Sequence, residues 1–151
     1  MKINKFALVI GFAIASVLFL EVAAHADERN RSTQLTFSTP IEIPGHVLPA
    51  GTYQFKLADE DDLDVVQIFN ADGTRLYASL QTIATERREP TGDTVLVMAE
   101  QGTERPEALL KWFYPGHTTG NEFVYSKHEE QQLAQDRQHT ILAKETAEAG
   151  D

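Results

Sequence analysis

The chain has 151 residues, no cysteine and a formal net charge of −10, and this length suits one domain with a core of its own. The lack of cysteine excludes disulfides, thiol nucleophiles and cysteine-ligated metal sites. The acidic balance argues against nucleic acid as a partner, because both molecules are anions.

The first 26 residues have the pattern of a secretory signal peptide. Lys2 and Lys5 give a cationic start, an apolar run follows from Phe6 to Leu20, and Ala24-His25-Ala26 supplies small residues for cleavage. The run is shorter than the roughly 20 apolar residues that span a bilayer. We therefore expect a signal-peptide helix over 1–26, cleavage after Ala26, and a secreted or periplasmic mature chain that does not span the membrane.

A polar leader over 27–32 precedes a region, 33–127, in which apolar and polar side chains alternate over short segments, as they do in strands. Asn70-Ala71-Asp72-Gly73 separates two of these segments, and Asp-Gly favours a tight hairpin. We predict a mainly β fold, a single antiparallel β-sandwich or small barrel. The segments lie at 33–38, 41–43, 53–57, 65–69, 75–83, 94–99, 108–114 and 122–125.

The end of the chain, 128–151, differs in composition. Glu, Gln, Ala, Lys and Arg predominate, and these residues favour helix. Its apolar side chains are few, chiefly Leu133, Ile141 and Leu142, so a helix here has little to bury. We expect a polar C-terminal α-helix, or a partly disordered tail, that docks weakly on the β domain.

Aromatic residues are concentrated between Lys111 and Tyr125, around a Pro-Gly-His loop. Alternation along a strand places Trp112 and Tyr114 on one face, which favours a place in the core. The alternative is an exposed surface for a sugar or peptide. In that case the ligand-binding residues are Trp112, Tyr114, His117 and Asn121.

Two histidines follow Pro-Gly pairs, His46 and His117. They could share a metal ion if the fold brought their loops together, but the sequence does not indicate that it does. His128 and His139 lack the spacing of paired zinc ligands on a helix. Motifs of hydrolases, zinc proteases and phosphate-binding loops are absent, which predicts no cofactor and no enzymatic activity.

Three stretches, Pro44–Phe55, Val65–Ala78 and Ala108–Tyr125, resemble a family of small exported β-rich proteins of unknown function from soil bacteria such as acidobacteria. The resemblance covers 33–127. It implies a signal peptide followed by one β-rich domain, and it brings no activity, ligand or site residue with it.

These observations together favour an exported, non-enzymatic binding or structural protein of the periplasm or cell envelope. Its expected partner is an envelope protein or a glycan of unknown identity. The first alternative is a carbohydrate- or peptide-binding module that uses the aromatic residues around Trp112. The second is a metal-dependent enzyme, which requires His46 and His117 to converge.

Overall fold

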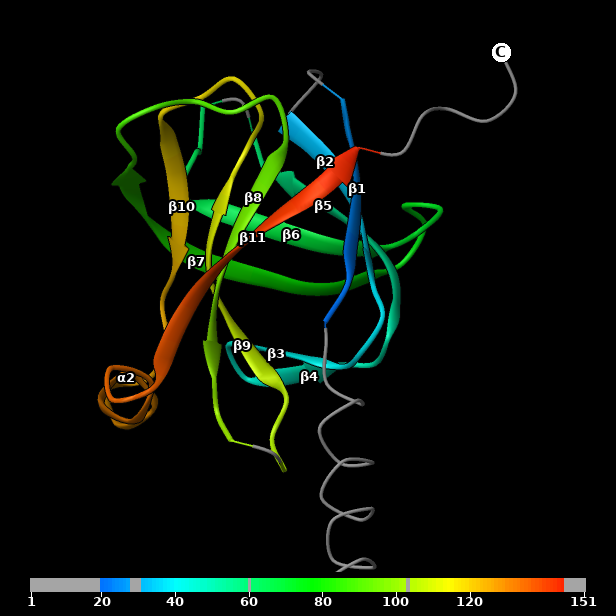
Figure 1. Ribbon diagram of the computed structural model, residues 1–151. Coiled ribbons are helices and arrows are strands. Elements are labelled where there is room, and N and C mark those ends of the chain that lie inside the picture. Colours follow the sequence, from blue (N-terminus) through cyan, green and yellow to red (C-terminus); the bar gives the residue numbers. More distant parts are fainter. Residues whose placement is uncertain (1–19, 28–30, 60, 103, 146–151) are drawn as a thin grey trace, which may run out of the picture.

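The computed structural model describes residues 20–27, 31–59, 61–102 and 104–145. These residues form eleven strands and one short helix, α2 (Lys127–Leu133) (Figure 1). The predicted mainly β fold with a C-terminal helix is confirmed. The strands are β1 (Val22–Asp27), β2 (Ser32–Phe37), β3 (Ile41–Ile43), β4 (His46–Leu48), β5 (Gly51–Leu57), β6 (Val65–Asn70), β7 (Leu76–Glu86), β8 (Thr94–Glu100), β9 (Glu107–Phe113), β10 (Thr119–Phe123) and β11 (Arg137–Glu145).

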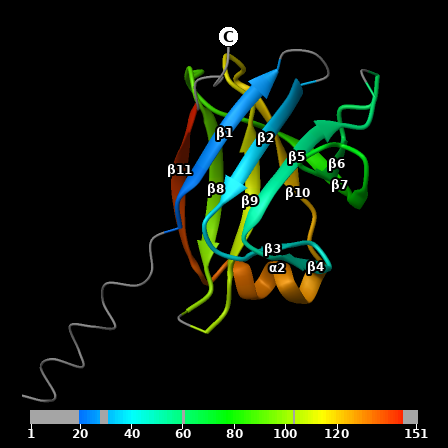
Figure 2. The same cartoon turned by 90° about the vertical axis from the view of Figure 1, so that its right-hand side faces the viewer.

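The strands belong to one hydrogen-bonded sheet with the order β10-β7-β6-β5-β2-β1-β11-β8-β9-β3-β4. An additional pairing joins β10 to β9, so the sheet folds back on itself in a sandwich-like form (Figure 2). Most neighbours are antiparallel, as the short connections predict. Two pairs, β1–β11 and β3–β9, are parallel, which the sequence does not indicate.

The hairpin between β6 and β7 has the turn that its sequence predicts. Gly73 takes a φ of 71°, and its N–H donates to the Asn70 carbonyl at 2.9 Å. The side-chain oxygen of Asn70 accepts from the N–H groups of Thr74 at 2.8 Å and Arg75 at 3.1 Å. The positive φ explains the glycine, and the Asn70 side chain satisfies the remaining turn donors.

The core lies inside the folded sheet and is built from alternate side chains. β2 and β5 bury every second residue, including Leu35 and Phe55. Phe55 packs edge-on against Trp112, with ring centroids 6.0 Å apart and an interplanar angle of 76°. Each large side chain buried this way contributes roughly 1.5–3 kcal/mol, so this cluster is a main source of stability.

The predicted helical tail over 128–151 is only partly correct. Helix α2 occupies its start, but residues 137–145 form β11, which pairs with β8 from Arg137 opposite Glu100 to Ala143 opposite Thr94. Pairing with β8 overrides the helical composition, because it satisfies the backbone and buries Ala143 completely. Residues 146–151 lie outside the described part of the chain.

The predicted signal peptide ends in residues that the structure places in the sheet. Residues 1–19 lie outside the described part of the chain, whereas Val22–Asp27 form β1, between β2 and β11. Val22 and Ala24 are buried in the core cluster. The predicted cleavage after Ala26 therefore falls inside a paired strand. The predicted polar leader 27–32 spans the end of β1 and the start of β2.

Candidate functional site: a cleft beneath the short helix

The predicted aromatic surface belongs to the core. Trp112 is 1% exposed and Tyr114 is also buried. Tyr114 contacts the ring of the half-buried His117, with centroids 5.5 Å apart. Neither Trp112 nor Tyr114 presents its ring to solvent. Of the two interpretations of this segment, the structure agrees with the core.

Asn121, the fourth residue of the predicted ligand-binding set, holds two strands and a loop together. Its side-chain amide donates to the Leu63 carbonyl at 2.7 Å and to the Thr82 hydroxyl at 2.9 Å. Asn121 is on β10 and Thr82 on β7, and the residue is buried. A buried amide with two such partners is explained by the fold without a ligand.

The two histidines after Pro-Gly pairs do not meet. His46 is on β4, whose partner β3 lies beside the first residues of β9. His117 lies in the loop after the last residue of β9, Phe113. A strand of this length spans about 20 Å, so β4, which carries His46, lies toward the start of β9, and the loop that carries His117 follows the end of β9. Figure 1 shows β4 and the end of β9 on opposite sides of the molecule. The two histidines therefore do not form a shared metal site, which would require their loops to converge.

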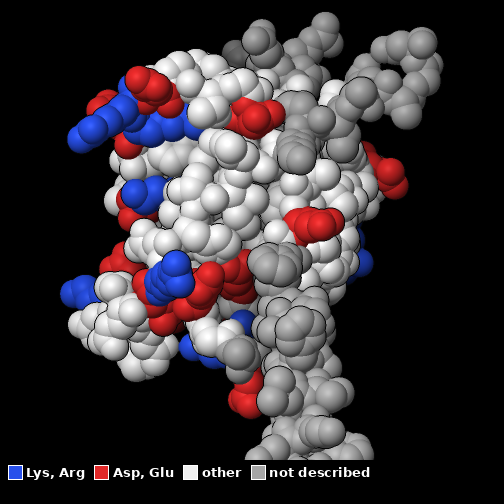
Figure 3. Space-filling model, viewed as in Figure 1, with Lys and Arg blue, Asp and Glu red and all other residues white. Residues whose placement is uncertain are grey.

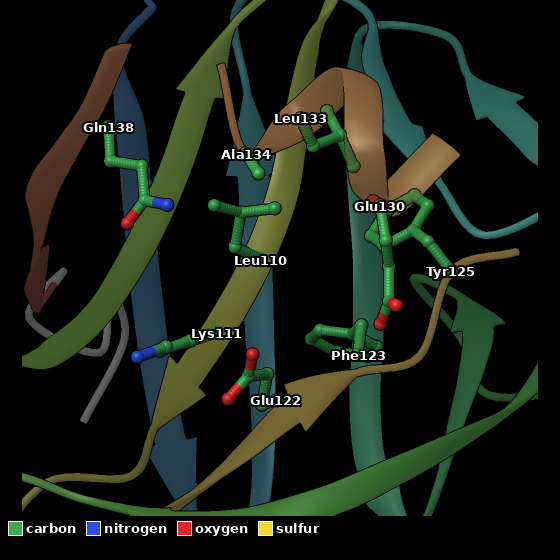
Figure 4. A pocket seen from close by; sticks show the side chains of 9 residues that line it. All are labelled: Leu110, Lys111, Glu122, Phe123, Tyr125, Glu130, Leu133, Ala134 and Gln138. Atoms are coloured by element: carbon green, nitrogen blue, oxygen red, sulfur yellow. The ribbon is translucent and has the colours of Figure 1, made fainter. Parts of the chain in front are cut away.

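The fold instead forms a cleft of about 340 Å³ between α2 and strands β9 and β10 (Figure 4). Leu110, Phe123 and Leu133 supply its apolar surface. In the view of Figure 4, Leu110 faces Leu133, and Phe123 lies between the carboxylates of Glu122 and Glu130. The volume of the cleft lies at the lower end of the range of small-ligand sites, and polar and apolar side chains both line it.

Local sequence explains how α2 reaches this position. Ser126 caps the helix: its hydroxyl accepts from the Glu129 N–H at 3.3 Å, and the Glu129 carboxylate accepts from the Ser126 N–H at 3.3 Å. Such reciprocal capping fixes the start of a helix. Leu133, at the other end, is the buried residue of α2. Helix α2 is thus held at its start by the cap and at its end by the buried side chain of Leu133.

The rim of the cleft carries both charge signs. Lys111 on β9 and Glu122 on β10 are register partners, so their side chains project from the same face. Glu130 of α2 adds a second carboxylate. Acidic side chains also gather next to α2 on the face shown in Figure 3, with basic ones interspersed. The charged lining of the cleft is therefore net negative.

Tyr125 lies at the back of the cleft and acts as an anchor. Its hydroxyl donates to the Leu109 carbonyl at 2.7 Å and approaches the Glu42 carbonyl at 3.3 Å. Burial raises the pKa of Tyr125 far above its ordinary value of 10.0, and the charges of Glu42 and Glu129 raise it further. The phenol therefore stays protonated and holds β9 and β3 together behind the cleft.

Sequence reasoning missed this cleft because it requires contacts between Leu110, Phe123 and Leu133, which belong to three different elements. One signal was present: Ser126-Lys127-His128-Glu129 has the spacing of a capping box. It marks the beginning of α2, but it does not indicate which face of the sheet the helix covers.

Comparison with protein-family models, with curated proteins and with solved structures finds no match to this chain. Within the described residues, no helix is both long and apolar enough to cross a membrane. A fold alone does not imply a function, which depends on the residues of particular sites.

Proposed function

We propose that this is an exported, non-enzymatic binding protein of the periplasm or cell envelope, and that its ligand occupies the cleft beneath α2. The observation that carries the proposal is the cleft itself, about 340 Å³ in volume and lined by Leu110 together with the charged residues Lys111, Glu122 and Glu130. The N-terminal sequence pattern supports export, with cleavage after Ala26 as the expected processing step.

The lining indicates the chemistry of the ligand. Leu110 is half-buried and offers apolar surface to a ligand, whereas Phe123 and Leu133 are buried beneath it. The carboxylates of Glu122 and Glu130 outnumber the ammonium of Lys111. The whole chain is also acidic, with a net charge of −10, which attracts cations to its surface. The cleft therefore suits a small molecule or a peptide segment that carries an apolar group next to a positive charge.

A sugar is less well matched to this site. Carbohydrate sites present an exposed aromatic face on which the sugar ring packs. The two aromatic residues of the cleft, Phe123 and Tyr125, are buried, as are Trp112 and Tyr114. The structure thus favours a peptide-like or amine-bearing ligand over the glycan that the sequence left open.

Hexylammonium tests the proposal, because it is an apolar chain with one positive charge. In a titration followed by backbone amide NMR, we expect saturable shifts at Leu110, Phe123 and Leu133. Hexanoate has the same chain with a negative charge and should perturb these amides less. Glu122→Gln should weaken hexylammonium binding several-fold.

Glu86→Gln is the matched control, because Glu86 is an exposed carboxylate at the end of β7 and does not line the cleft. It should leave hexylammonium binding unchanged. A purely structural protein would show no saturable shifts in the cleft with either probe. That result, or equal binding of hexylammonium by the wild-type protein and Glu122→Gln, would refute the proposed site.

A further inference from the structure

Three side chains of metal-ligating types, from three neighbouring strands, lie together in a cluster that contains neither histidine of the predicted pair. Glu100 ends β8, Glu107 begins β9 and His139 lies on β11. One ligand atom from each residue lies within 4.8 Å of the other two. The Nε2 atom of His139 is in hydrogen-bond contact with Oε1 of Glu107.

The backbone ladders hold these residues in place. β8 lies between β11 and β9, and its register sets His139 opposite Met98 and Ala99 opposite Ala108. Glu100 follows Ala99 on β8 and Glu107 precedes Ala108 on β9, so both residues lie at the end of the β8–β9 ladder. Residues directly opposite each other project from the same face, and the face recurs every second residue. His139 therefore shares a face with Met98 and with Glu100.

The three side chains are accessible enough for a bound ion to exchange with solvent. The side chains of His139 and Glu107 are 34% and 22% exposed, so both are partly desolvated but reachable. Ligand atoms around one zinc ion lie roughly 3 to 4 Å apart, given bond lengths of about 2.0–2.2 Å. The observed spacing needs only side-chain rotation to reach that geometry.

Charge is the second argument for a cation. Two carboxylates adjoin one imidazole, and among the described residues no ion pair joins either carboxylate to an arginine. Arg105 is paired with Glu42 at 3.4 Å. Arg137 is the exposed register partner of Glu100, but no ion pair joins the two among the described residues. A divalent cation balances the two carboxylates and uses the imidazole as a neutral ligand.

From this geometry we propose that Glu100, Glu107 and His139 form a binding site for a divalent transition-metal ion of the zinc class. One nitrogen and two carboxylate oxygens are a ligand set that Zn²⁺ accepts, with water completing the coordination. Ca²⁺ and Mg²⁺ prefer oxygen ligands throughout, so the histidine selects against them. The site is independent of the cleft beneath α2, whose lining shares none of these three residues.

Zn²⁺ titration of the protein purified after expression of the full chain tests this site. Histidine-ring NMR should show the resonances of His139 shifting to saturation at one equivalent, while those of His46, His117 and His128 stay in place. In calorimetry, His139→Gln and Glu107→Gln should each weaken Zn²⁺ binding more than about tenfold, since even the outer-shell partners of metal ligands are worth 10- to 100-fold. Ca²⁺ at the same concentration should not displace Zn²⁺.

His128→Gln is the matched control, because His128 lies on α2 and does not belong to the cluster of Glu100, Glu107 and His139; it should bind Zn²⁺ like the wild-type protein. The proposal fails if His139 does not respond to Zn²⁺, if His139→Gln binds as tightly as the wild-type protein, or if Ca²⁺ competes equally. Should His139→Gln not fold, the ring resonances of the wild-type protein decide the question alone. Hexylammonium binding in the cleft is a separate measurement and does not depend on this outcome.

Discussion

At the scale of single residues, Gly120 shows how closely β9 and β10 pack. A Cβ atom built at Gly120 would lie 2.6 Å from the Trp112 carbonyl oxygen and 2.5 Å from a ring carbon of Phe113. Neither neighbour is the free end of a flexible chain. The sequence shows this glycine only as part of a Thr-Thr-Gly loop, because the close approach depends on a strand earlier in the chain.

We expect Gly120→Ala to lower the free energy of unfolding by about 1–3 kcal/mol, the usual cost of forcing extra volume into a packed site. Urea unfolding followed by Trp112 fluorescence measures the change. Gly92→Ala is the control, because a Cβ atom at Gly92 has no neighbour within 4 Å. Equal unfolding midpoints for the two variants would show that β9 and β10 can separate at little cost.

The buried side chain of Tyr125 leads to a prediction for stability at alkaline pH. Burial, followed by the charges of Glu42 and Glu129, raises its pKa above the ordinary 10.0 in the folded chain. At pH values between the pKa of Tyr125 in the unfolded chain and its raised pKa in the folded chain, the folded chain keeps a proton that the unfolded chain has released. The free energy of unfolding therefore falls as pH rises through this range. Stability should therefore be constant with respect to this group below pH 10 and decline above it.

Tyr125→Phe removes this titration and should flatten the loss of stability above pH 10. At neutral pH the same variant should cost about 1–3 kcal/mol, because it leaves the buried Leu109 carbonyl without its donor. Urea midpoints at neutral pH and above pH 10 measure both effects. Unchanged pH dependence in Tyr125→Phe would assign the alkaline transition to other groups, among them Tyr53, whose pKa burial also raises.

At the scale of elements, alternation predicted β2, β3 and β5 to β7, which bury alternate residues. Apolar runs predicted β8 and β9, whereas the segment predicted at 122–125 overlaps β10 only at its end. Alternation failed for β11, where a strand that pairs on both sides contains only Ile141 and Leu142 as large apolar residues. Its pairing with β8 joins segments far apart in sequence, such as Thr140 and Val97, and composition does not encode such a partner. The cleft could not be predicted from the sequence for the same reason, since it depends on where α2 docks.

The position of β1 leads to a prediction for this element. Removing Leu20–Ala26 exposes the partner strands β2 and β11 and loses the burial of Val22 and Ala24. Burying one valine contributes roughly 1.5–3 kcal/mol and each hydrogen bond about 0.5–1.5 kcal/mol. A chain beginning at Asp27 should therefore be at least about 3 kcal/mol less stable than one beginning at Leu20.

Urea unfolding of the two chains measures this difference, and point variants check its cause. Ala24→Glu places a charge on the buried face of β1, whereas Ala23 is only partly buried. Ala24→Glu should thus destabilise the longer chain much more than Ala23→Glu. If the two chains unfold at the same urea concentration, β1 adds nothing to the sheet.

At the scale of the whole molecule, the two candidate sites share no residue, although Gln138 of the cleft is next to His139 in the chain. The cleft lies between α2 and strands β9 and β10, whereas the three residues proposed to bind a metal lie at one end of the β11–β8–β9 ladders. Both sites depend on β9, which pairs with β8, β10 and β3. A ligand in either site therefore binds the folded state and should stabilise the molecule against unfolding.

If the chain is exported and cleaved as proposed, the place of β1 sets the order in which cleavage and folding must occur. The bond between Ala26 and Asp27 lies where β1 pairs with Thr33 and Ser32 of β2, and a peptidase needs that backbone unpaired. Cleavage after Ala26 must therefore happen before β1 joins the sheet, and a chain that folds first is protected from the cut. The relative rates of cleavage and folding would thus determine whether β1 pairs with β2 and β11 in the final protein.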